Sequence, residues 1–166
     1  MKYVSQLLCA AMLFLVSVYA QEENHMGPTI IPTPQQVVPK NVRFKIAAGT
    51  KIILGANSRP EQFAAQQIND AFGSRKEAQL KIAGENSLRK LPASFIFIGS
   101  PLSDYGRQLL RERKGILTPS MKDEGYFLDI DANGAVIIAE SDKGKFYGVM
   151  SLLQMMHREK RSVLVD

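Results

Sequence analysis

The sequence predicts an α+β domain in which helices pack against a mixed β-sheet. Short runs of alternating or continuous apolar residues, typical of strands, separate three longer segments whose apolar residues recur with helical spacing. Asn133-Gly134, between two of these runs, is a strong signal for an antiparallel hairpin. The expected order is β β α β β α β β α β, which is typical of a sheet covered by helices.

Residues 1–20 have the three parts of a secretory signal peptide. Lys2 supplies the positive charge, residues 7–18 form an apolar run, and Val18-Tyr19-Ala20 offers a cleavage site. The apolar run is shorter than the roughly 20 residues that a membrane-spanning helix needs. We therefore expect a secreted or periplasmic protein that has no membrane association after cleavage.

Composition excludes several classes of site. The only cysteine, Cys9, lies in the expected signal peptide, so the mature chain would have no disulfide, thiolate metal site or cysteine nucleophile. The formal net charge is +5, but the 21 basic residues are scattered among 16 acidic ones. This distribution favours a solvated surface, and we expect no nucleic-acid partner.

The mature chain is expected to form one domain. Residues 21–29 are polar and are interpreted as a flexible leader, and the domain is placed at residues 30–166. Prolines between residues 28 and 39 exclude a helix there and favour an extended segment. Four apolar side chains are expected to clamp this segment against the domain. They are Ile30, Ile31, Val37 and Val38.

Seven segments have the composition or alternation of strands. They are residues 42–46, 51–54, 79–83, 94–98, 126–130, 135–139 and 163–165. Residues 94–98 (SFIFI) are apolar on both alternations, which predicts a central strand covered on both faces.

The three helices have recognisable starts. Asn57 or Ser58 is suited to cap the first, and the second is expected to begin near Ser100 or Ser103. The third is expected to cover residues 143–157, with apolar residues along one face.

The sequence contains no common catalytic or metal-binding motif. HExxH, a calcium-binding loop, a G-x-S-x-G elbow, G-x-G-x-x-G and a P-loop are all missing from it. His25 belongs to the expected leader. His157 is expected at the end of the third helix, either near the last carbonyls or partly buried beside Met156. We therefore expect no catalytic, cofactor-binding or metal-binding residue in this chain.

Asp123-Glu124 is the carboxylate pair that most resembles an acid–base site. Adjacent residues on a strand point to opposite faces, so a solvated loop before a strand is the preferred interpretation. Asp129, Asp131 and Asp142 are interpreted as alternate-face or turn residues. Lys143-Gly144-Lys145 has a single glycine and makes a poor phosphate cradle.

Several segments together resemble a known domain. The chain has I-P-x-P-Q at residues 31–35, then T-K-I-I, an Ala-rich helix and an F-I-x-I-G strand. The most specific parts are Glu124-Gly125-Tyr126 and residues 144–148 (GKFYG), followed by Leu152-Leu153-Gln154. Over roughly residues 30–157 the sequence resembles the N-terminal accessory domain of β-N-acetylhexosaminidases of glycoside hydrolase family 20. Similar domains precede the barrels of family 84 enzymes and some α-glucuronidases.

The resemblance implies a sheet with helices packed against it, similar to the zincin-like fold but without a metal site. In such enzymes a following (β/α)8 barrel holds an Asp-Glu pair that acts by a substrate-assisted mechanism on terminal N-acetylhexosamine residues. A barrel needs at least about 200 residues, so we expect a truncated enzyme that is inactive alone. Asp123-Glu124 matches the accessory domain's motif and is not that catalytic pair.

Two other functions stay open. A stand-alone secreted module that binds glycans or a partner protein would present an aromatic platform of Tyr105, Tyr126 or Tyr147, although core or rim positions are the preferred interpretation of these tyrosines. A purely structural domain that supports a barrel would expose an apolar surface on one helix and near residues 163–165.

Overall fold

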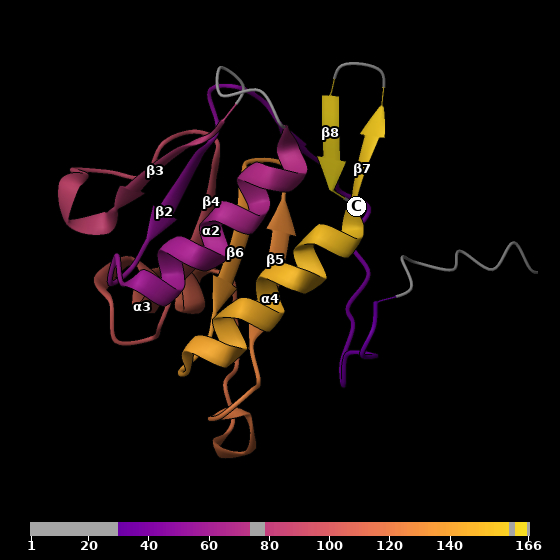
Figure 1. Ribbon diagram of the computed structural model, residues 1–166. Helices are drawn as coiled ribbons and strands as arrows, with labels where there is room; N and C mark the ends of the chain where they lie inside the picture. The colour runs from indigo at the N-terminus through magenta and orange to yellow at the C-terminus, as the bar shows by residue number, and fades with distance from the viewer. Residues whose placement is uncertain (1–29, 74–78, 160–161, 166) are drawn as a thin grey trace, which may run out of the picture.

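The computed structural model describes residues 30–73, 79–159 and 162–165 (Figure 1). The expected signal peptide, the leader and His25 lie outside these residues. In the part that is described, no helix has the length and apolar character needed to cross a membrane.

The strands form two sheets, and with the helices they confirm the predicted α+β class. The larger sheet has the order β3-β2-β4-β6-β5, in which only the β5–β6 pair is antiparallel. Its strands are β2 (Lys51–Leu54), β3 (Lys81–Gly84), β4 (Phe95–Gly99), β5 (Phe127–Asp131) and β6 (Gly134–Ile138). The smaller, antiparallel sheet has the order β1-β8-β7. Its strands are β1 (Phe44–Ile46), β7 (Met156–Glu159) and β8 (Ser162–Val165).

The central strands separate two layers of the core. Every residue of β4 and β6 is buried, which confirms the prediction of a strand covered on both faces at residues 94–98. Ile96 and Ile98 pack toward one layer, and Phe97 packs toward the other. This division follows from the alternation of side chains along a strand.

In the described part of the chain, three helices cover the larger sheet. They are α2 (Arg59–Phe72), α3 (Asp104–Glu112) and α4 (Asp142–Met155), with short 3-10 turns η2 (Glu85–Ser87) and η3 (Pro119–Met121) between them. Helices α2 and α4 run side by side over one face, and α3 lies behind the sheet (Figure 1). Each helix begins after a serine whose side-chain oxygen accepts a backbone N–H of the first turn. These caps are Ser58, Ser103 and Ser141.

The predicted hairpin is present between β5 and β6. One oxygen of Asp131 accepts the N–H groups of Asn133 and Gly134 at 2.8 and 2.9 Å. A side chain at position 134 would place its Cβ 2.1 Å from the carbonyl oxygen of Phe95. Glycine is therefore required there by close packing against β4.

The prediction that the third helix reaches His157 is wrong. Helix α4 ends at Met155, and β7 begins at Met156 and pairs with β8. His157 is a half-buried residue of that strand, opposite Leu164. The helical spacing continues through Met156, but pairing with a later strand decides the conformation there.

The expected apolar clamp of the proline-rich segment is wrong for three of its four residues. Ile30 is half-buried, but Ile31, Val37 and Val38 are 73%, 63% and 69% exposed. Polar contacts hold the segment instead. The Gln154 side chain accepts the N–H of Ile31 at 2.8 Å and donates to its carbonyl at 3.0 Å, and Lys40 pairs with Asp129.

Candidate functional site

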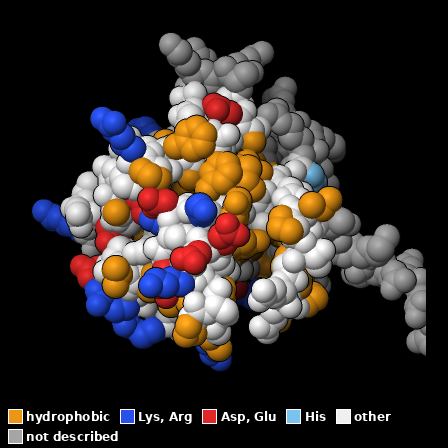
Figure 2. Space-filling view, turned by 60° about the horizontal axis from the view of Figure 1, so that its bottom comes forward, with side chains coloured by type: hydrophobic (Ala, Val, Ile, Leu, Met, Phe, Trp, Pro, Cys, Tyr) orange, Lys and Arg blue, Asp and Glu red, His pale blue; other side chains and the backbone are white. Residues whose placement is uncertain are grey.

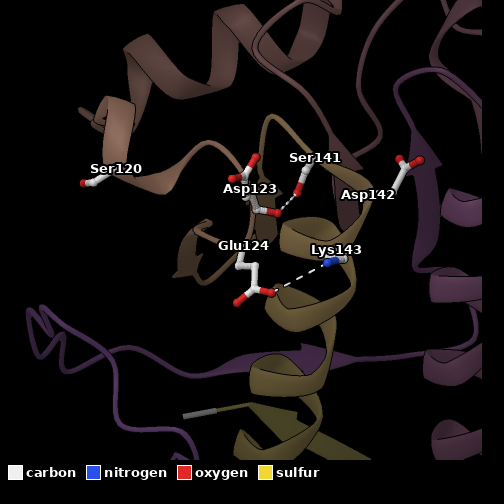
Figure 3. Close-up of a pocket in the computed structure, with 6 residues that line it drawn as sticks. All are labelled: Ser120, Asp123, Glu124, Ser141, Asp142 and Lys143. Carbon is white, nitrogen blue, oxygen red and sulfur yellow. Dashed lines mark hydrogen bonds and ion pairs between the residues drawn. The ribbon is translucent and has the colours of Figure 1, made fainter.

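Asp123 and Glu124 lie in the loop before β5 and line an open pocket beside the start of α4 (Figure 3). The other lining residues are Ser120, Ser141, Asp142 and Lys143. The two carboxylates point away from one another in Figure 3, as expected for adjacent residues. This separation does not favour a shared acid–base role.

The contacts in this pocket are those of a solvated surface. The hydroxyl of Ser141 donates to the backbone carbonyl of Asp123, which joins the loop to the start of α4. Lys143 lies 3.8 Å from Glu124, and their side chains are 73% and 61% exposed. Exposed pairs of this kind contribute little stability.

An ionic cluster, largely buried, lies at the first turns of α2 and α4. The ammonium nitrogen of Lys145 is 3.0 Å from a Glu61 oxygen and 2.7 Å from an Asp142 oxygen. The second oxygen of Glu61 accepts the N–H of Ala56 at 2.9 Å. The cluster therefore ties α4 to α2 and to the loop before α2.

Lys145 is held in its charged form. Burial alone would lower the pKa of its ammonium group, but the hydrogen bonds that it donates to Asp142 and Glu61, together with the negative charges of these carboxylates, outweigh burial and raise the pKa. A lysine of this kind is a structural cation and is not suited to act as a base or nucleophile. The structure also places Lys143 and Lys145 with different partners, so they do not form one anion site.

A second ionic cluster lies on β5. One guanidinium nitrogen of Arg113 is 2.8 Å from Asp129 and 2.7 Å from Asp131, and Lys40 also pairs with Asp129. The sequence predicted Asp129 as an alternate-face or turn residue but did not predict its burial. It is only 8% exposed. Both carboxylates are neutralised by cations, which suits a structural role.

The three tyrosines do not form one platform. The Tyr126 hydroxyl lies 2.5 Å from the Ser151 hydroxyl, and its ring lies beside Gly148. Tyr105 packs against the apolar layer behind the sheet. Tyr147 is 41% exposed, and its ring lies 6.2 Å from that of Phe146.

Sequence reasoning missed both buried ionic clusters. Glu61 and Lys145 are 84 positions apart, so no local pattern connects them. Lys145 lies in a charged first turn, Asp142-Lys143-Gly144-Lys145, so its sequence context does not mark it as buried. Over residues 30–73, 79–159 and 162–165, no group of three or more His, Cys, Asp or Glu residues is placed to hold a metal ion.

A family model described as glycosyl hydrolase family 20, domain 2, matches residues 27–165. The chain belongs to this family. The match confirms the resemblance to the accessory domain of family 20 enzymes.

A curated relative is a β-hexosaminidase of Porphyromonas gingivalis, 28% identical over 141 residues. The aligned region covers 84% of this chain and 15% of that protein, so this chain spans only a small part of the relative's length.

Solved structures with the same fold include CpGH84B, with a TM-score of 0.60 and 23% identity over 84% of this chain and 21% of that one. The family 20 β-N-acetylhexosaminidase of Streptomyces coelicolor has a TM-score of 0.57 and 20% identity, over 82% and 24% of the two chains. An exo-β-N-acetylglucosaminidase of Vibrio harveyi has a TM-score of 0.57 and 15% identity, over 85% and 18%. At these identities the likeness shows the fold alone.

Proposed function

We propose that this chain is the non-catalytic N-terminal domain of a secreted β-N-acetylhexosaminidase that removes terminal N-acetylhexosamine residues. The observation that supports this most is the family match over residues 27–165. The catalytic Asp and Glu would lie in a following (β/α)8 barrel of the parent polypeptide. The signal-like residues 1–20 support export to the periplasm or the exterior.

The geometry of the charged residues supports a non-catalytic role. Asp123 and Glu124 diverge in an open pocket, whereas Asp129 and Glu61 are buried against cations. A glycosidase needs two carboxyl groups, or a carboxyl group and a substrate acetamido group, arranged around one sugar ring. In the described part of the chain, the pocket that Asp123 and Glu124 line is open, and their carboxylates point apart.

The test is an assay of the purified 166-residue protein on a chromogenic N-acetylglucosaminide. We expect no turnover above a blank without protein. The nucleotide sequence after the codon of Asp166 completes the test, because the proposal requires an in-frame barrel in the parent gene. Turnover by the 166-residue protein, or the lack of any such barrel, would contradict the proposal.

A glycan-binding module is the second candidate, and Tyr147 is the observation that favours it. This ring is 41% exposed beside Phe146, as aromatic sugar-binding residues are. Binding of N-acetylhexosamine glycans on an array, lost in Tyr147→Ala and retained in Tyr126→Phe, would assign this function to the chain.

A further inference from the structure

The hairpin between β5 and β6 carries the only Asn-Gly dipeptide of the sequence, Asn133-Gly134. Because glycine has no side chain, its backbone nitrogen reaches the side-chain amide of the preceding asparagine more readily than the nitrogen of a larger residue does. Asn133 is exposed to solvent. The pair is therefore chemically suited to lose ammonia spontaneously, and the local structure decides how fast it does so.

This reaction, deamidation, forms one bond and breaks one before water completes it. The backbone nitrogen of Gly134 loses its proton and attacks the side-chain carbonyl carbon of Asn133. The side-chain nitrogen leaves as ammonia, which carries the proton away, and a five-membered imide remains. Water is the co-reactant that opens the imide at either of its carbonyl groups, so the product has aspartate or isoaspartate at position 133.

The attacking nitrogen is engaged in the folded hairpin. The N–H of Gly134 donates to Oδ1 of Asp131 at 2.9 Å, and the same oxygen accepts the N–H of Asn133 at 2.8 Å. The other carboxylate oxygen of Asp131 lies 2.7 Å from a guanidinium nitrogen of Arg113, which holds the carboxylate in place. A negative charge beside the Gly134 N–H opposes loss of its proton, and the hydrogen bond must break before the nitrogen can attack.

The backbone on either side of the reacting bond is also fixed. The carbonyl of Asn133 accepts the N–H of Phe95 at 3.2 Å. The carbonyl oxygen of Phe95 lies so close to Gly134 that an added Cβ would be 2.1 Å away from it. Asp131 pairs with Gly134 at the end of the ladder, so only two residues form the loop between the strands. Closing the imide ring would disturb these contacts with β4.

We propose that Asn133 is a deamidation site that the Asp131 carboxylate keeps closed in the folded domain. Opening of the hairpin, or loss of this carboxylate, frees the Gly134 nitrogen and starts the reaction. The site depends on the fold of this chain alone, whether or not a catalytic barrel follows it in the parent protein.

Deamidation would alter a balanced group of charges. Asp129 and Asp131 share Arg113, and Lys40 also pairs with Asp129. On the face that Figure 2 shows, acidic side chains likewise lie beside basic ones. Either product adds a negative charge two positions from Asp131, so it works against the balance of this cluster.

The isoaspartate product would also change the main chain. The chain then runs through the former side chain of Asn133, and the carbonyl that accepts the N–H of Phe95 becomes part of a free carboxylate. This carbonyl would no longer be fixed by the main chain on both sides. We therefore expect the deamidated protein to unfold at a lower urea concentration than the intact protein.

Peptide mapping by mass spectrometry tests the proposal, because deamidation changes the mass and the charge of the peptide that contains residue 133. The 166-residue protein is incubated at mildly alkaline pH, both folded and in urea. In urea we expect Asn133 to react faster than Asn86, which precedes a serine. In the folded protein Asn133 should react at least severalfold more slowly than in urea.

Two variants separate the hydrogen bond from the ion pair. Asp131→Ala and Asp131→Ser both lose the pair with Arg113, but the serine hydroxyl can still accept a backbone N–H of the turn. We expect Asp131→Ala to deamidate severalfold faster than the wild type and faster than Asp131→Ser. Urea unfolding curves identify a temperature at which all three proteins are folded, so global unfolding does not supply the difference. Asp104→Ala removes an exposed carboxylate paired with Arg107 and should leave the rate at Asn133 unchanged.

Each failure would contradict a different part of the proposal. Equal rates in the folded protein and in urea would mean that the hairpin gives no protection. A wild-type rate in Asp131→Ala would show that the carboxylate is not the guard. Equal rates in Asp131→Ala and Asp131→Ser would assign the protection to the ion pair with Arg113 and overturn the role of the hydrogen bond. An Asn133 that stays unmodified even in urea would mean that there is no such site.

Discussion

The ammonium nitrogen of Lys145 lies 3.0 Å from a carboxylate oxygen of Glu61, and this buried pair joins the first turns of α4 and α2. The side chains are only 8% and 1% exposed. Removing one partner from such a pair leaves a buried charge behind, which costs far more than the pair contributes as a whole.

Replacing Lys145 by Met should therefore destabilise the domain strongly. We expect the free energy of unfolding in urea to fall by about 3 kcal/mol, because Glu61 loses its cation while it stays buried. The control is Lys143→Met, whose exposed partner Glu124 is 3.8 Å away, and which should cost less than about 1 kcal/mol. Similar losses in the two variants would show that the Lys145–Glu61 pair contributes no more to stability than the exposed Lys143–Glu124 pair.

The same lysine predicts a dependence of stability on alkaline pH. The folded-state pKa of Lys145 is raised above the ordinary value of 10.5, so its contribution is fully present below that value. The contribution is lost as the pH rises through the folded-state pKa. The urea midpoint of the wild-type chain should therefore fall more steeply above about pH 10.5 than that of Lys145→Met. Parallel curves for the two proteins would be incompatible with a raised pKa.

Replacing Gln154 by Ala should release the proline-rich segment. Its side chain makes two hydrogen bonds to the backbone of Ile31, each worth about 0.5–1.5 kcal/mol. Hydrogen exchange and protease cleavage should rise within residues 31–38, while the global urea midpoint changes little. Gln66→Ala removes an exposed bond to Asp70 and is the matched control. Unchanged exchange in Gln154→Ala would mean that the pair with Lys40 is sufficient to hold the segment.

Replacing Tyr126 by Phe should destabilise the domain, whereas the same change at Tyr147 should not. Tyr126 bonds to Ser151, which is 3% exposed, so the change leaves a buried hydroxyl without its partner at a cost of about 1–3 kcal/mol. Tyr147 is 41% exposed. Thermal unfolding of the two variants tests this difference. Equal midpoints would show that the Tyr126 hydroxyl does not stabilise the domain.

Local signals predicted most of the elements. Lys51–Leu54 is found as expected, and Ser58 and Ser103 cap helices, because caps and turns depend on residues within a few positions. Asn133-Gly134 gave the hairpin for the same reason. The accessory-domain resemblance likewise came from short motifs that keep their spacing.

The errors share one physical cause, which is a partner distant in the sequence. The residues around His157 fit a helix until β8 offers backbone hydrogen bonds, and Ile31 faces solvent because Gln154 binds its backbone instead. The divergence of Asp123 and Glu124 was expected from their adjacency. Which lysine is buried was beyond local reasoning, because it depends on how α4 packs beside Glu61 of α2.

The pairing of β1 with β8 has a consequence for synthesis of the protein. Phe44 lies opposite Val165, so two ends of the domain meet in one small sheet. All strands of the larger sheet lie between residues 51 and 138 and can associate before β8 leaves the ribosome. Strand β1 emerges early but finds its hydrogen-bonding partner only when β8 has been made, so the small sheet is the last to be completed during translation.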